Sequence, residues 1–116
     1  MKILLYQIPF HKVAAILAGA KAIGAEVVYL KDEDLHNSIE FLMDGNRNQN
    51  PGKDSQKAVG ELMIFGGFSD NDLDEFLAGY HSTNAPAVAA KAMMTPVNQR
   101  WSPAYLYAQL LNEIRK

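Results

Sequence analysis

The sequence predicts an α/β fold in which one four-stranded sheet is covered by helices. Three observations indicate this. Short apolar runs alternate with segments of helical periodicity. Hydrophobic residues make up 48% of the chain and charged residues 21%, which is the balance of a globular protein. Similar segments also recur in the two halves. At 116 residues we expect a single α/β domain over residues 1–116.

An internal similarity appears when the sequence is shifted along itself by 60 positions, and a second one appears at a shift of 64. We interpret these matches as two tandem β-α-β-α half-repeats, residues 1–43 and 61–116, joined by a polar loop over residues 44–60. The matched segments are Ile3-Leu4-Leu5 with Met63-Ile64-Phe65 and Ile16 to Gly19 with Phe76 to Gly79, and at the second shift Asp34 with Asn98, Ser38 with Ser102 and Leu42 with Leu106.

In the first half, an apolar run predicts a strand, and Pro9 then suits the first turn of a helix because it lacks an N–H group. Gly24 is a typical stop for that helix, and Ser38 can cap the next one. The predicted elements are a strand from Lys2 to Gln7, a helix to about Ile23, a strand from Val27 to Leu30 and a helix from Ile39 to Met43 ended by Gly45.

In the second half, Ser69 and Asp72 form the pattern of a capping box at the start of a helix. Ser102 and Pro103 are typical of the start of another helix. The predicted elements are a strand from Leu62 to Phe65, a helix with Leu73, Phe76, Leu77 and Tyr80 on its buried side, a weaker strand from Ala87 to Met94, and a final helix with Leu106, Leu110, Leu111 and Ile114 facing inward.

The predicted strands are apolar on both faces, as Ile3 and Leu5 against Leu4 and Tyr6 illustrate. Both faces of the sheet therefore need cover, from helices or from a dimer partner. A parallel three-layer sheet and a ferredoxin-like α+β fold with extra helices both fit. A helix after each strand favours the first.

The composition excludes several classes of function. The chain has no cysteine, so disulfides, thiolate metal sites and thiol catalysis are excluded. A net charge of −2 gives no general attraction to DNA or to anionic lipid. Polar residues interrupt the first apolar run too early for a signal peptide, and no stretch is long enough to span a membrane. We expect a cytoplasmic protein.

No motif for a metal, a cofactor or catalysis emerges. His36 and Glu40 lie four positions apart but have no third ligand nearby. Asp70 to Glu75 lacks the glycine and glutamate that a calcium loop needs, and its acidic residues suit the first turn of a helix. The same acidic residues would repel a phosphate from the turn at Gly66 to Ser69. We therefore predict no catalytic residue, no metal and no cofactor.

The best candidate binding patch lies just before the final helix. Thr95, Asn98, Gln99 and Arg100 offer hydrogen-bonding groups beside Trp101, which is the single tryptophan of the chain. Such a set is typical of peptide-binding hot spots and of base stacking. The alternative is structural, because Trp101 precedes the capping residue Ser102 and can pack on the final helix as a hydrophobic staple does.

The run from Met94 to Ser102, Met-Thr-Pro-Val-Asn-Gln-Arg-Trp-Ser, resembles the signature of DUF3783, a small bacterial family of unknown function. That signature is a strand ending in Thr-Pro-x-Asn, a short loop, and Trp-Ser or Trp-Thr opening a leucine-rich final helix. The resemblance extends from the turn at Phe65 to Ser69 to the end of the chain. Met94 and Pro103 stand where other residues are common, which leaves the pattern intact. It implies the fold and a bacterial origin, and it adds no catalytic residue.

These observations predict a non-catalytic binding or regulatory module that associates with another protein or forms a homodimer. One alternative is a small-molecule enzyme or sensor with its pocket between the two halves. Another is a weak RNA-binding module, which would have to depend on a local patch because the overall charge is negative.

Overall fold

The architecture comes from a computed structural model that describes residues 1–46 and 59–114. One mixed sheet with the strand order β2-β1-β3-β4 runs through the middle of the molecule. Its described elements are β1 (Lys2–Tyr6), α1 (Phe10–Ile23), β2 (Glu26–Tyr29), the 3₁₀ turn η1 (Asp32–His36), α2 (Ile39–Met43), β3 (Leu62–Gly66), α3 (Asp70–His81), β4 (Lys91–Met93), the 3₁₀ turn η2 (Asn98–Arg100) and α4 (Pro103–Ile114).

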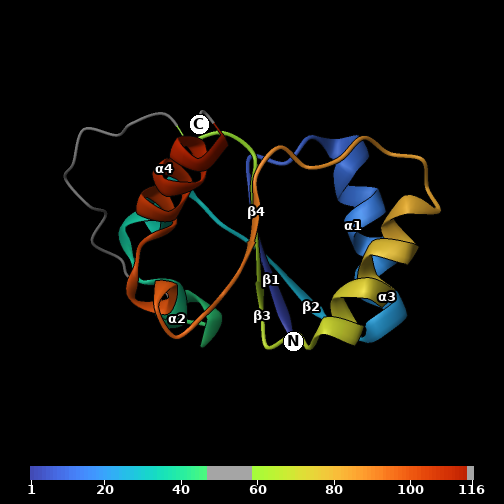
Figure 1. Ribbon diagram of the computed structural model, residues 1–116, viewed down its shortest axis with the longest axis horizontal. Helices are drawn as coiled ribbons and strands as arrows, with labels where there is room; N and C mark the ends of the chain where they lie inside the picture. Colours follow the sequence, from blue (N-terminus) through green and yellow to red (C-terminus); the bar gives the residue numbers. More distant parts are fainter. Residues whose placement is uncertain (47–58, 115–116) are drawn as a thin grey trace.

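The sheet is the middle of three layers, with α1 and α3 on one face and α2 and α4 on the other (Figure 1). β1 pairs with β2 in parallel, β3 pairs with β4 in parallel, and the central pair β1–β3 is antiparallel. The predicted α/β class with one four-stranded sheet covered by helices is confirmed. The expectation of a fully parallel sheet is wrong, and so is the ferredoxin-like alternative, because helices cover both faces and both outer pairs are parallel.

The central strands carry the hydrophobic core on both faces. Ile3 and Leu5 of β1 point to the layer of α1 and α3, whereas Leu4 and Tyr6 point to the layer of α2 and α4. Every residue of β3 is buried. A strand that is apolar on both sides needs cover on both sides, which explains why the helices divide between the two faces.

The two halves of the chain have the same order of elements, and the contacts between them follow the first sequence shift. The β1–β3 register is centred on the pair Leu4–Ile64, whose members are 60 positions apart. Gly19 of α1 and Gly79 of α3 have the same separation. A Cβ atom placed on Gly79 would lie 3.0 Å from the Cα atom of Gly19. These contacts are what a duplication predicts, and the common origin of the halves stays a prediction.

The second shift corresponds to a repeated hydrogen-bonding pattern in the two 3₁₀ turns. The backbone N–H of Lys31 donates to the carboxylate of Asp34 at 2.8 Å, and the N–H of Thr95 donates to Oδ1 of Asn98 at 2.7 Å. Asp34 and Asn98 are both buried. Neither turn was expected from the sequence, which predicted only short loops there.

Other boundaries follow local chemistry. Gly24 ends α1 in the left-handed conformation with φ of 70°, and Ser69 forms the predicted capping box with Asp72 at the start of α3. The strand expected from Ala87 to Met94 is shorter, because Ala89 donates its N–H to the side chain of Glu61 rather than to a strand. Residues 47–58 of the predicted loop, and the side chain of Ile114, lie outside the described residues.

The close approach of α1 and α3 gives a first prediction. A Cβ on Gly19 would lie 2.7 Å from the backbone carbonyl oxygen of Phe76, and a backbone atom cannot move aside as a flexible side chain can. We expect Gly19→Ala to lower the free energy of unfolding by about 1–3 kcal/mol, measured by urea denaturation. Ala22→Ser, at an exposed position of the same helix, is the control. Equal stability of the two variants would contradict this packing.

Candidate functional site

The loop singled out in the sequence is largely committed to holding the fold together. Thr95 and Asn98 bond reciprocally, since the N–H of Asn98 donates to the hydroxyl of Thr95 at 3.0 Å while Asn98 accepts from the N–H of Thr95. The side-chain amide of Asn98 also donates to the carbonyl of Met93 at 3.0 Å. Both polar ends of Asn98 are therefore occupied, and we interpret this residue as structural. Gln99 is half-buried, and its N–H donates to the carbonyl of Thr95 at 2.9 Å.

Trp101 also has structural contacts. Its ring lies edge-on to the ring of Tyr105, with the centroids 4.9 Å apart, and it packs against the core beneath α2 and α4. Its carbonyl accepts the N–H of Ile39 at 2.8 Å, which joins η2 to the start of α2. The aromatic contact resembles the predicted staple, although the partner is Tyr105, one position before the usual one.

We group three exposed side chains of this loop and of the start of α4, those of Val97, Arg100 and Tyr105, as a smaller patch. Val97 is 70% exposed and Tyr105 is 50% exposed. Arg100 is exposed as well, and no hydrogen bond or ion pair joins its side chain to another described residue. Of the five residues predicted to bind a partner, Arg100 is thus the exposed one whose side chain makes no hydrogen bond to another described residue.

This division of roles gives a second prediction. Asn98→Ala removes the two hydrogen bonds that the Asn98 side chain makes in a buried turn, and we expect it to lower the free energy of unfolding by about 1–3 kcal/mol. Arg100→Ala, two positions away, should change it by no more than about 0.5 kcal/mol. Thermal or urea unfolding of both variants checks the expectation. A destabilisation by Arg100→Ala as large as that by Asn98→Ala would refute it.

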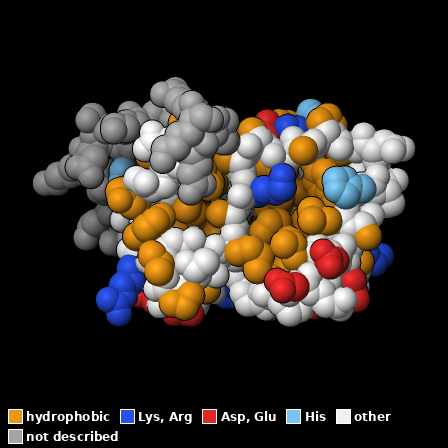
Figure 2. All heavy atoms as spheres, viewed as in Figure 1, with side chains coloured by type: hydrophobic (Ala, Val, Ile, Leu, Met, Phe, Trp, Pro, Cys, Tyr) orange, Lys and Arg blue, Asp and Glu red, His pale blue; other side chains and the backbone are white. Residues whose placement is uncertain are grey.

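The structure shows a second candidate, an apolar groove between α3 and the edge strand β4. Figure 2 shows hydrophobic side chains gathered on both sides of β4 on this face of the molecule. The groove contains two neighbouring cavities that share Leu77 and Lys91. The first cavity is lined by Met63, Phe76, Leu77, Tyr80, His81, Ala87, Val88 and Lys91, and the second by Phe65, Leu73, Leu77, Lys91, Ala92 and Met93.

The two cavities follow the register of the sheet. The first lies over the pair Met63–Lys91, and the second lies over the pair Phe65–Met93. Residues two apart in a strand point to the same face, at a spacing of about 6.6–7 Å. The groove therefore repeats at the spacing of alternate residues in an extended chain.

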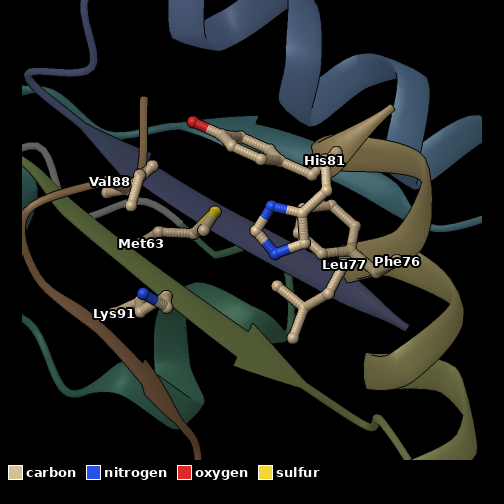
Figure 3. A pocket seen from close by; sticks show the side chains of 8 residues that line it. Met63, Phe76, Leu77, His81, Val88 and Lys91 are labelled. Atoms are coloured by element: carbon tan, nitrogen blue, oxygen red, sulfur yellow. The ribbon is translucent and has the colours of Figure 1, made fainter. Parts of the chain in front are cut away.

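The rim of the first cavity is basic. Figure 3 shows His81 and Lys91 projecting toward the cavity from α3 and from β4, with Met63 between them. Both basic side chains belong to exposed residues. An apolar hollow with a lysine amine at its rim suits an apolar group that has a carboxylate nearby.

The size of the cavities limits the ligand. Their volumes are about 100 Å³ and about 270 Å³. Sites for drug-sized molecules have about 300–1,000 Å³. The first cavity is therefore suited to a single side chain rather than to a whole metabolite.

Strand β4 has one open edge. The carbonyl of Ala90 and the N–H of Met94 form hydrogen bonds with β3. In a parallel pair, the backbone groups of successive residues point alternately toward and away from the neighbouring strand. The N–H and C=O of Lys91 and the N–H of Met93 therefore point away from the sheet. Among the described residues these three groups have no partner. The carbonyl of Met93 is already taken by Asn98. The open edge and the two cavities lie side by side.

A partly buried ion pair holds one wall of the groove in place. Lys12 of α1 lies 2.8 and 3.1 Å from the two carboxylate oxygens of Glu61, which also accepts the N–H of Ala89 at 3.0 Å. Nearby, the hydroxyl of Tyr80 donates to the carbonyl of Pro86. These contacts fix residues 86–89, and this segment includes the lining residues Ala87 and Val88.

The ion pair gives a pH-dependent prediction. Burial alone raises the pKa of Glu61, but the hydrogen bonds from Lys12 and Ala89 outweigh it and hold this pKa below the ordinary value of 4.5. A lowered pKa in the folded state stabilises the protein at higher pH, and this contribution is lost as the pH falls through the lowered value. We expect Glu61→Gln to be less stable than the natural chain at neutral pH and the difference to shrink below about pH 4.5.

Urea unfolding of Glu61→Gln at a series of pH values checks this prediction, with Glu26→Gln on exposed β2 as the control. A difference between Glu61→Gln and the natural chain that is independent of pH would rule out the carboxylate as the group responsible.

Little in the sequence pointed to this groove. Met63, Phe76, Leu77 and Val88 read as ordinary core residues, and only their meeting at an edge strand creates the cavities. One signal was available, since Lys91 is the single charge in the apolar run from Ala87 to Met94. An isolated lysine in an apolar strand is typical of a sheet edge.

A shallow hollow of about 240 Å³ lies where the sequence suggested a pocket between the halves. It is lined by residues of both halves, Met1, Lys2, Met43, Gly66, Gly67 and Met94.

Within residues 1–46 and 59–114, no three His, Asp or Glu side chains gather as metal ligands would. The helices of that part of the chain are all too short or too polar to cross a membrane.

Comparison with known proteins gives one match. The model of a family described as a domain of unknown function, DUF3783, matches residues 61–116 and confirms the resemblance seen over the C-terminal half. No curated protein matches the chain significantly. No solved structure matches it either. The matched segment contains β3, α3, β4 and α4, and hence every residue that lines the two cavities of the groove.

Proposed function

Since the model that matches residues 61–116 describes DUF3783, a domain of unknown function, we propose a function from the geometry alone. The protein is a non-catalytic module that binds another protein on the face around β4. The observation that carries this proposal is the apolar groove beside β4, whose first cavity has the size of a side chain rather than of a metabolite.

Two further features support binding to a protein. Exposed apolar patches rimmed by polar groups mark interaction sites in many proteins. The patch of Val97, Arg100 and Tyr105 follows β4 directly in the chain and adds an arginine and a tyrosine, which are residue types enriched at interface hot spots. The binding role predicted for the Thr95 to Trp101 loop is thereby retained for Arg100.

A second candidate is a small-molecule sensor, which the hollow lined by both halves favours. Among the described residues that line it, Lys2 has a charged side chain, so a small anionic ligand is the chemistry that would fit. A metabolite that bound there would stabilise the protein by mass action, by about 2.7 kcal/mol at a concentration one hundred times its dissociation constant. Thermal-shift measurements with anionic metabolites test this alternative.

Photo-crosslinking tests the proposed function. A photoreactive phenylalanine analogue replaces His81 at the rim of the groove, and in a control it replaces exposed Ala22 of α1. After irradiation in cells, we expect covalent adducts heavier than the chain from position 81 and none from position 22. An adduct of twice the chain mass identifies a homodimer, and other masses identify a different protein.

Two results would contradict the proposal. The first is the absence of protein adducts from position 81. The second is adduct formation that is equal at positions 81 and 22, which would mean that the groove has no preference over the rest of the surface.

A further inference from the structure

We propose that the partner binds as an extended strand that pairs with β4, with apolar side chains at alternate positions in the two cavities and acidic side chains near Lys91 and His81. This inference rests on the proposed function and names the chemistry of the partner.

The first argument is the unused hydrogen-bonding capacity of β4. The N–H and C=O of Lys91 and the N–H of Met93 point outward from the last strand of the sheet. A peptide that adds a strand at such an edge gains main-chain hydrogen bonds, while pockets for its alternate side chains give specificity.

The second argument is the match between the cavities and a strand. The cavities lie over consecutive same-face pairs, Met63–Lys91 and Phe65–Met93. A neighbouring strand aligned with β4 presents its alternate side chains to the same face at the same spacing. Two apolar residues separated by one residue therefore fill both cavities, whereas two adjacent apolar residues point to opposite faces.

The third argument is charge. Lys91 and His81 lie at the rim of the first cavity, on the face of the sheet that the apolar side chains enter. A carboxylate two positions beyond an apolar residue lies on that same face. The acidic residues of the partner therefore belong at alternate positions as well.

The same charge disfavours a second copy of β4 as the added strand. Pairing two copies of β4 across a two-fold axis would place Lys91 near its counterpart on one face of the joined sheet. Like charges at neighbouring cross-strand positions are destabilising. The occupant that fits is an acidic segment of a different protein.

Fluorescent peptides with blocked ends test the inference. The probe is Gly-Glu-Thr-Val-Thr-Val-Thr-Glu-Gly, whose pattern presents valines and glutamates on one face whichever way it runs. The matched control, Gly-Glu-Thr-Thr-Val-Val-Thr-Glu-Gly, has the same composition but places the valines on opposite faces. By fluorescence anisotropy we expect the probe to bind at least about tenfold more tightly than the control, as the loss of one well-buried apolar side chain implies.

Two variants separate the main chain of β4 from its side chains. Lys91→Ala and Lys91→Pro both remove the amine, but only proline also removes the outward N–H, and neither removes a hydrogen bond to β3. We expect Lys91→Pro to bind the probe about fivefold more weakly than Lys91→Ala, the effect of one hydrogen bond. A version of the probe with lysine in place of glutamate tests the charge. The natural chain should prefer the glutamate probe over this version, and the preference should be smaller in Lys91→Ala.

A readout on the natural chain does not depend on how the variants fold. Bound probe should slow hydrogen exchange at the N–H of Met93, measured by NMR. The donors that face β4 belong to the threonines of the probe in a parallel alignment and to its valines in an antiparallel one. Of two probes, one N-methylated at its threonines and one at its valines, only one should therefore lose these donors and bind more weakly than the parent probe.

The inference is wrong if both valine patterns bind equally, if Lys91→Pro and Lys91→Ala bind the probe alike, or if the probe leaves exchange at Met93 unchanged. Its failure can be told apart from failure of the proposed function. If no peptide binds but position 81 still crosslinks to a protein, the groove holds a folded surface and only the strand inference is lost. If neither occurs, both are lost.

Discussion

The antiparallel pairing of β1 with β3 is the constraint on which the rest of the structure depends. Both strands are buried on both faces, so the chain must supply two separate layers of helices to cover them. The pairing also joins the two halves at their centres, at Leu4 and Ile64. Each half then adds its second strand in parallel on the outside. The two shortest strands of the sheet, β2 and β4, are therefore its edges.

An open edge carries a risk of non-specific pairing, and β4 is partly protected against it. The side chain of Asn98 occupies the carbonyl of Met93, the strand has only three residues, and Lys91 faces the helix layer beside the groove. Short strands and inward-pointing lysines are common protections of this kind. The protection is incomplete, because the backbone groups of Lys91 stay open. In the proposed strand binding, the short edge and Lys91 disfavour most extended chains and favour those whose charge and spacing are complementary.

The sequence predicted the fold more fully than the site. Apolar runs, capping residues such as Ser69 and stop signals such as Gly24 act locally, so they located the helices and the central strands. The bonds of Asn98 could not be predicted, because a polar side chain looks the same in the sequence whether it bonds to a ligand or to its own backbone. The groove could not be predicted, since Leu77, Val88 and Lys91 lie on three segments that meet only after β4 takes its place at the edge.

The two halves use the same architecture for different surfaces. At the second sequence shift, Lys91 and Met93 of β4 correspond to Val27 and Tyr29 of β2. The backbone bonding of the two edge strands is also equivalent. The N–H of Leu30 donates to the carbonyl of Leu5, and the N–H of Met94 donates to the carbonyl of Phe65. The first edge thus presents an apolar residue where the second presents a cation. The family match covers only the half with the cation and the groove. If the fold arose by duplication, the second copy is the one that has a lysine and the two cavities at its edge strand, while the first copy has Val27 at the matching position.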